Sequence, residues 1–140
     1  MMVCWAPVLL MGYALTVTTE WHKTQNVDAP IVEVQSCERG VGLHAKASAS
    51  WLYGLGLHYG VQWRSERWSV TVQPHAGLSY ADHPIDAVPL RTQFELGAEA
   101  SVGYGPARVG VAYWHLSNAG LKEPNIGLDM VILQMGWAWE

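Results

Sequence analysis

Apolar and polar residues alternate along most of this chain, in runs of about ten residues, which is the length that a β-strand needs to cross a membrane. The stretch Trp68–Tyr80 illustrates the pattern. One parity carries Trp, Val, Pro, Ala, Leu and Tyr, and the other carries Ser, Thr, Gln, His and Gly. Because successive side chains of a strand point to opposite faces, such a run predicts a strand with one apolar and one polar face.

Seven runs alternate clearly: Met11–Trp21, Val41–Tyr53, Leu55–Trp63, Trp68–Tyr80, Gln93–Tyr104, Val109–Trp114 and Val131–Trp139. Ile31–Cys37 alternates more weakly and brings the count of expected strands to eight. No loop marks the boundary between the third and fourth of these strands, near Tyr53–Gly54. Trp and Tyr gather at the run ends on the apolar parity, as in the aromatic girdles of membrane barrels. The pattern predicts an all-β fold, an eight-stranded antiparallel up-and-down transmembrane β-barrel. It forms a single domain over residues 1–140, with strands from about residue 9.

The predicted connections alternate in length. Three are long, His22–Pro30, Ala81–Arg91 and Asn118–Ile126, and three are short, Glu38–Gly40, Ser65–Glu66 and Gly105–Pro106. Outer-membrane barrels have long outer loops and short periplasmic turns. We therefore expect the seventh strand to run outward and to end near His115.

The inward parity predicts a hydrogen-bonded polar core that fills a narrow lumen. Its expected members are Glu20, His44, Lys46, His58, His75, Glu95 and Glu99. We interpret the histidines as interior residues that bond their neighbours. No metal and no cofactor is expected.

Composition narrows the class further. Half of the 140 residues are hydrophobic and 14% are charged, against about 25% in soluble domains. The net charge of −4 argues against a nucleic-acid partner, which needs a basic face. Cys4 and Cys37 stand apart from any metal or redox motif, and whether they pair stays open. Met1–Val8 has no Lys or Arg, so no clear signal peptide is recognised.

Two polar residues break the apolar parity of the seventh run. His115 and Ser117 are two positions apart, about 6.5 Å along a strand, so an imidazole can reach the hydroxyl. If the last hairpin closes symmetrically about Lys122, Asp129 lies opposite His115 on the same face and completes a Ser-His-Asp triad. The alternative is that His115 and Ser117 are rim residues where the strand leaves the membrane.

The stretch HLSNAGLKEPN, followed closely by GLD, resembles the motif of the lipid A 3-O-deacylases, the PagL family of outer-membrane enzymes. The typical form there is H-[YF]-S-N-A-G-[IL]-K-x-P-N-x-G, which spans the last hairpin of an eight-stranded barrel. PHAGLSY resembles a second family segment, P-x-x-E-A-G-I-G, more loosely. The resemblance is firm over the last third of the chain. Leu116 replaces the usual aromatic residue, and His75 stands near a position where Glu is common.

The resemblance implies a serine esterase that hydrolyses the 3-position acyl ester of lipid A. Ser117 is then the nucleophile, His115 the general base and Asp129 the acid, where the best-known member has Glu. Asn118 and Asn125 match family asparagines, and Asn125 is linked to the oxyanion hole. The Asn118 side chain and the backbone amides near Gly120 are further candidate donors for the oxyanion, although plain turn chemistry also explains these residues.

The implied setting is the outer membrane of a Gram-negative bacterium. Lipopolysaccharide is then the substrate, and outer-membrane lipids surround the barrel. Whether the protein forms a homodimer stays open. Arg91 and Lys122, on expected outer loops, are candidates to meet lipid A phosphates, or are solvated loop charges. The alternatives are a non-catalytic barrel of the OmpA-like type and a soluble lipocalin-like binder.

Overall fold

The computed structural model describes residues 2–3, 8–18, 24–36, 40–48, 52–85, 88–119, 121 and 128–138. The regular structure of these residues consists of β-strands, and every pairing between strands is antiparallel. The strands are β1 (Met2–Val3), β2 (Val8–Thr18), β3 (Thr24–Gln35), β4 (Val41–Ser48), β5 (Leu52–Tyr59), β6 (Val61–Ser65), β7 (Trp68–Ile85), β8 (Val88–Tyr104), β9 (Ala107–Ser117) and β10 (Leu128–Ala138).

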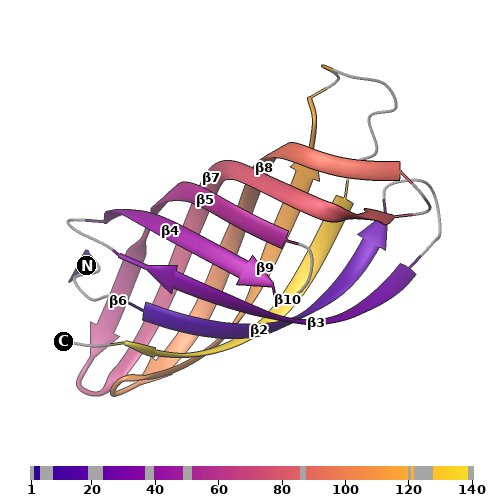
Figure 1. Ribbon diagram of the computed structural model, residues 1–140. Helices are drawn as coiled ribbons and strands as arrows, with labels where there is room; N and C mark the ends of the chain where they lie inside the picture. Colours follow the sequence, from indigo (N-terminus) through magenta and orange to yellow (C-terminus); the bar gives the residue numbers. More distant parts are fainter. Residues whose placement is uncertain are drawn as a thin grey trace.

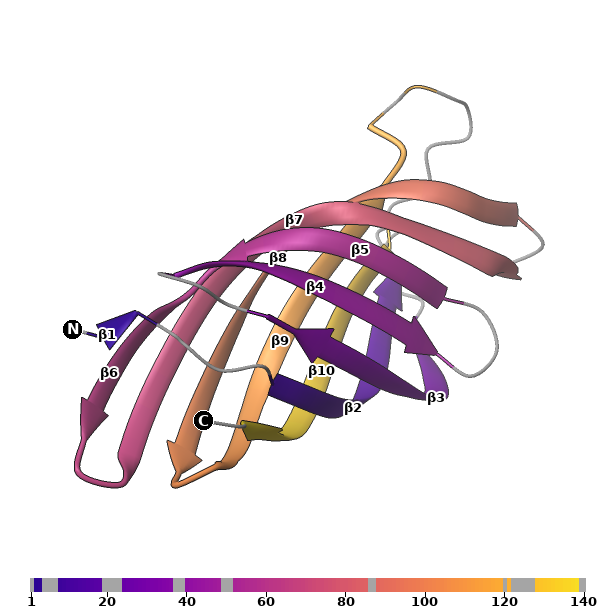
Figure 2. The same cartoon turned by 60° about the vertical axis from the view of Figure 1, so that its left-hand side comes forward.

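Eight of these strands pair in a closed ring. The order is β2–β3–β4–β5–β7–β8–β9–β10, and β10 pairs back onto β2. β6 continues β5 beyond Gly60, because both strands pair with β7 in one common register. His58 of β5 lies opposite His75, and Val61 of β6 lies opposite Val72. The short β1, which the sequence pattern does not predict, pairs with β6. The predicted eight-stranded antiparallel barrel is confirmed, and its tilted strands curve around one axis in Figures 1 and 2.

The outer face of the ring is apolar. On β8 and β9 the outward residues Leu96, Val109 and Tyr113 are 61%, 66% and 47% exposed, while Ala112 between them on the inner face is fully buried. Soluble monomers rarely expose so continuous an apolar surface, whereas lipid-facing strands require it. This outer face argues against a soluble lipocalin-like binder. In the part of the chain that the structure describes, no helix is long and apolar enough to cross a membrane.

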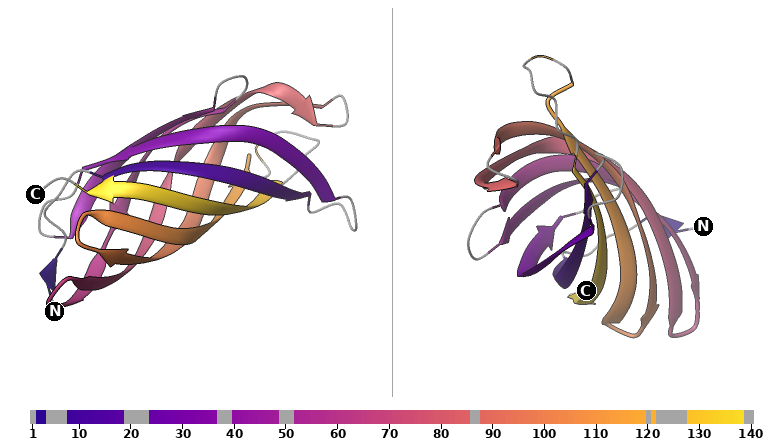
Figure 3. Two further views of the ribbon diagram at one scale, coloured as in Figure 1. Left: turned by 90° about the horizontal axis from the view of Figure 1, so that it is seen from below. Right: turned by 90° about the vertical axis from the view of Figure 1, so that its right-hand side faces the viewer.

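Two of the two-residue turns mark one end of the barrel. The β6–β7 and β8–β9 turns lie at the same end as the N- and C-terminal strand ends (Figures 1 and 3). Consequently β9 finishes and β10 starts at the opposite end, where Ser117 and Leu128 lie. This agrees with the expected outward direction of the seventh barrel strand.

The sequence pattern misplaces several strand ends. The expected strand Val41–Tyr53 is wrong, because β4 ends at Ser48 and Tyr53 belongs to β5. Odd-numbered residues point outward on both strands, so the alternation continues through the reversal and hides it. The first and last strands, expected at Met11–Trp21 and Val131–Trp139, each begin three residues earlier.

Two of the expected long loops are largely strand. The range His22–Pro30 is expected as a long loop, but β3 already starts at Thr24. Similarly, within Ala81–Arg91, β7 continues to Ile85 and β8 starts at Val88. Register irregularities accompany both extensions, between Tyr13 and Ala14 and between Ala81 and Pro84. Such bulges allow proline within a strand, and the strand propensities of the residues do not predict where a bulge occurs.

The lumen is polar, as predicted. Its buried members include His44, Lys46, His58, His75, Glu95 and Glu99, whereas Glu20 lies outside the described residues. Glycines leave room for the imidazole rings, because a Cβ on Gly56 or Gly97 would overlap the ring of His44 or His75. Among the described residues, no group of three or more His, Cys, Asp or Glu is arranged to hold a metal ion.

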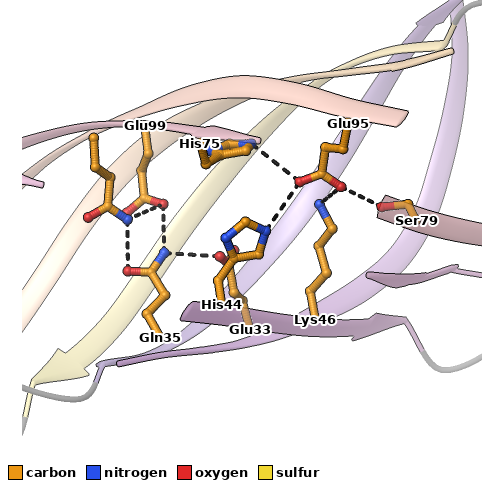
Figure 4. Close-up of polar contacts among 9 residues, drawn as sticks. Glu33, Gln35, His44, Lys46, His75, Ser79, Glu95 and Glu99 are labelled. Carbon is orange, nitrogen blue, oxygen red and sulfur yellow. Dashed lines mark hydrogen bonds and ion pairs between the residues drawn. The ribbon is translucent and has the colours of Figure 1, made fainter. Parts of the chain in front are cut away.

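Two clusters of polar side chains, each joined by hydrogen bonds or ion pairs, lie in this polar core (Figure 4). In the first, Glu95 forms an ion pair with Lys46 and accepts a hydrogen bond from Ser79. The Nε2 atoms of His44 and His75 lie 3.5 and 3.4 Å from Glu95 Oε1. Four side chains, two from β4 and two from β7, therefore converge on one carboxylate of β8.

The second cluster surrounds Gln35. Its amide nitrogen donates to Glu33 Oε1 and Glu99 Oε2, each at 3.0 Å, and its oxygen accepts from Gln73 at 2.8 Å. Gln73 also donates to Glu99, at 3.2 Å. Glu33, Gln35 and Gln73 are absent from the predicted polar core, in part because the run that carries Glu33 and Gln35 alternates weakly.

Candidate active site

Two polar side chains end the apolar outer row of β9. His115 and Ser117 are partly exposed, whereas their neighbours Trp114 and Leu116 are 1% and 0% exposed and point inward. Lys46 holds Trp114 in the lumen, with its ammonium nitrogen 3.3 Å from the ring centroid. Because these inner neighbours are packed, strand alternation makes His115 and Ser117 face outward.

The structure places Asp129 directly opposite His115 in the β9–β10 ladder, so the predicted register is confirmed. Asp129 Oδ1 lies 2.8 Å from His115 Nδ1. The side chain of Asp is thus long enough to reach the imidazole. The two side chains are 34% and 20% exposed, so the pair can be approached from the outer face.

This contact determines what the imidazole can do. When Nδ1–H of His115 donates to the carboxylate of Asp129, the neutral ring keeps a lone pair on Nε2 and can accept a proton there. Ser117 is two residues further along the same face. Within the described part of the chain, no hydrogen bond joins the Ser117 hydroxyl to His115, and such contacts often tighten only when substrate binds.

A residue that the sequence interpretation missed completes this group. The Tyr113 hydroxyl donates a hydrogen bond to Asp129 Oδ1 at 2.5 Å. The alternation pattern places Tyr113 only in the apolar outer row. Its signal was present in the register, because a residue two positions before His115 on β9 is the diagonal neighbour of Asp129 on β10.

The chain turns sharply after Ser117. The Asn118 carbonyl accepts a hydrogen bond from the Leu121 amide at 3.1 Å, and Ala119 has a φ of 54°, in the left-handed region that non-glycine residues seldom adopt. This turn keeps the Leu121 amide within hydrogen-bond distance of Asn118, directly after the end of β9. Of the predicted oxyanion residues, Asn118 is described and partly exposed, while Gly120 and Asn125 lie outside the described residues.

An apolar strip flanks the site on β8. Phe94 lies opposite Ser117 and Leu96 opposite His115, and these two side chains are 45% and 61% exposed. Arg91, three residues before Phe94, is exposed at the same end of the barrel. Lys122 lies outside the described residues, as do Cys4 and Cys37.

Comparison with known proteins shows the family to which this chain belongs. Residues 10–138 match the family model described as lipid A 3-O-deacylase (PagL). The lipid A deacylase PagL of Bordetella bronchiseptica (strain ATCC BAA-588 / NCTC 13252 / RB50) is 36% identical over 78 residues, which cover 51% of this chain and 41% of that protein.

Two solved structures share the fold. The crystal structure of the outer membrane enzyme PagL superimposes with a TM-score of 0.60 at 15% identity, covering 94% of this chain and 98% of that one. Neisserial surface protein A (NspA) gives 0.62 at 10% identity, covering 96% of each chain. At these identities the likeness shows the barrel fold, which agrees with the outer-membrane setting that the sequence predicts. Because the family model matches nearly the whole chain, the chain belongs to the lipid A 3-O-deacylase (PagL) family.

Proposed function

We propose that this protein is a lipid A 3-O-deacylase, a serine esterase that hydrolyses the 3-position acyl ester and releases a 3-hydroxy fatty acid. The observation that carries the proposal is the hydrogen-bonded pair of His115 and Asp129, with Nδ1 and Oδ1 2.8 Å apart on the lipid-facing side. His115 is two residues before Ser117 on the same strand. A hydrogen-bonded acid and imidazole depart from the apolar character of a lipid-facing row. Positions that break a local rule are where function is expected.

In the first half of the reaction, Ser117 Oγ attacks the ester carbonyl carbon while His115 Nε2 takes the hydroxyl proton. Asp129 stabilises the imidazolium that forms. Side-chain and backbone donors of Asn118 and Gly120, together with Asn125, stabilise the oxyanion; removing one such donor typically costs about 10²–10³ in kcat. The bond to the sugar oxygen then breaks, and that oxygen takes the proton from His115.

In the second half, water attacks the acyl group on Ser117. His115 accepts a proton from this water and returns it to Ser117 Oγ as the acyl–serine bond breaks, which releases the 3-hydroxy acid. Every step uses protein side chains, backbone amides and water, so the proposed reaction calls for neither metal nor cofactor.

The outer face suits a lipid substrate. The ester of a lipid in the outer leaflet can reach Ser117 laterally, while its acyl chain lies along Phe94 and Leu96, which are exposed on the adjacent strand. Arg91 is exposed at the same end and can pair with a lipid A phosphate. Lipid A is therefore the substrate that the apolar strip and the family membership support together.

The test is Ser117→Ala, with Ser65→Ala as the matched control, because Ser65 is an exposed serine at the opposite end of the barrel. Both variants are purified in detergent micelles, and folding is checked by heat-modifiable gel migration. Mass spectrometry of lipid A should show loss of one 3-hydroxyacyl group with the wild type and Ser65→Ala, and none with Ser117→Ala. Full activity in folded Ser117→Ala would refute the proposal.

The same spectra test the position of the ester. Loss of an ester-linked 3-hydroxy acid, with the amide-linked chains retained, supports 3-O-specificity. Release of a secondary acyl chain without a 3-hydroxyl group contradicts that specificity, although not the esterase mechanism. A folded wild-type barrel without any release would leave the non-catalytic barrel as the correct class.

A further inference from the structure

Two donors on β9 share one oxygen of Asp129. His115 Nδ1 lies 2.8 Å from Asp129 Oδ1, and the Tyr113 hydroxyl donates to the same oxygen at 2.5 Å. Asp129 faces His115 directly across the ladder, and Val131 faces Tyr113. Tyr113 is therefore the diagonal neighbour of Asp129, a separation that a tyrosine side chain spans.

We propose that Tyr113 is a positioning residue of the active site, which holds the Asp129 carboxylate in the orientation that His115 requires. This inference rests on the proposed function, because it gives Tyr113 a role in the same reaction. An aspartate side chain turns about two bonds, and a carboxylate bound at one point keeps freedom that a second donor removes. With Tyr113 bonded to Oδ1, that oxygen stays directed at Nδ1 of the imidazole.

The lipid-facing setting increases the value of this second donor. Asp129 is 20% exposed, and the outer face on which it lies borders hydrocarbon rather than water. A carboxylate that loses water needs protein donors in its place. The Tyr113 hydroxyl supplies one that does not change its charge during the reaction, whereas the protonation of His115 changes at every step.

The competing explanation is that Tyr113 is one more aromatic residue of the membrane girdle. Its ring is 47% exposed, which fits that role as well. The two roles use different atoms, because a girdle needs the ring and positioning needs the hydroxyl. Tyr113→Phe removes only the hydroxyl and therefore separates them.

The matched control is Tyr80→Phe. Tyr80 is an outward tyrosine on β7 with 44% exposure, and its hydroxyl has no hydrogen-bond partner among the described residues. Tyr113→Phe should lower kcat about tenfold with little change in KM, the usual effect of removing one hydrogen bond to a charged group. Tyr80→Phe should leave both constants within twofold of the wild type.

A double-mutant cycle shows whether Tyr113 acts through Asp129. In an Asp129→Ala background, Tyr113→Phe should change kcat less than twofold, because the group that it positions is gone. An undiminished tenfold loss in that background would overturn the inference. A wild-type kcat in Tyr113→Phe, with Ser117→Ala inactive, would also overturn the inference. That result would leave the proposed esterase function intact. Full activity of Ser117→Ala, in contrast, refutes the proposed function itself.

Ring nitrogen resonances provide a measurement that does not depend on turnover. In ¹⁵N-histidine-labelled protein in micelles, the wild type should show His115 with its proton on Nδ1. Tyr113→Phe should shift the resonances toward a mixture of tautomers, and Tyr80→Phe should not. This experiment decides the question if Asp129→Ala proves inactive, and identical His115 resonances in the wild type and Tyr113→Phe would refute the positioning role.

Discussion

Lys46→Met tests the polar core that supports the strand carrying the site. The side chains of Lys46 and its partner Glu95 are 0% and 1% exposed, and the Lys46 ammonium also lies 3.3 Å from the Trp114 ring centroid. Removing one partner of a buried ion pair costs about 3–5 kcal/mol. Methionine keeps most of the chain that packs beneath the ring but provides no charge. We therefore expect the free energy of unfolding to fall by about 3–5 kcal/mol, because Glu95 stays buried without its cation.

The assay is urea unfolding in detergent micelles, followed by tryptophan fluorescence and by the fraction of heat-modifiable protein on a gel. Glu95→Gln should also destabilise the barrel, since it leaves Lys46 unpaired. The double variant should recover about 2 kcal/mol relative to the sum of the two single losses, because it removes both charges together. As a control, Glu66→Gln, in the exposed β6–β7 turn, should change stability by less than about 0.5 kcal/mol. Additive single losses, or a Lys46→Met barrel as stable as the wild type, would refute this account of the lumen.

Two further predictions concern the outer wall and the strand spacing. Leu96→Arg puts a charge on the lipid-facing residue opposite His115, so we expect a loss of about 2–4 kcal/mol in micellar unfolding, while Leu96→Val stays within about 1.5 kcal/mol. An arginine variant as stable as the valine variant would contradict a lipid-facing position. Gly97→Ala adds a methyl group that would overlap the Tyr113 carbonyl and the His75 ring. It should cost about 1–3 kcal/mol in the same assay, and an unchanged midpoint would show that β8 and β9 can separate freely.

The proposed nucleophile and base could be picked out from the sequence because their signal is local. His115 and Ser117 are two residues apart on one parity, and strand geometry alone puts them on one face. Pairing Asp129 with His115 required a register across the hairpin, which an assumed symmetry about Lys122 supplied and the structure confirmed. Tyr113 could not be recognised in the same way. Its proposed role depends on a diagonal contact, and its residue type fits the aromatic outer row equally well.

The alternation of apolar and polar residues by itself determined the fold class, the outward and inward faces, and most of the polar lumen. Each of these follows from the two-residue period of a strand, which needs no knowledge of distant segments. Only the tertiary structure decided where β4 ends, how far β3, β7 and β8 extend, and which lumen side chains meet at Glu95 and Gln35. It also decided that one oxygen of Asp129 serves both Tyr113 and His115. Those contacts join residues on different strands, so their geometry is set by register and barrel closure rather than by any local pattern.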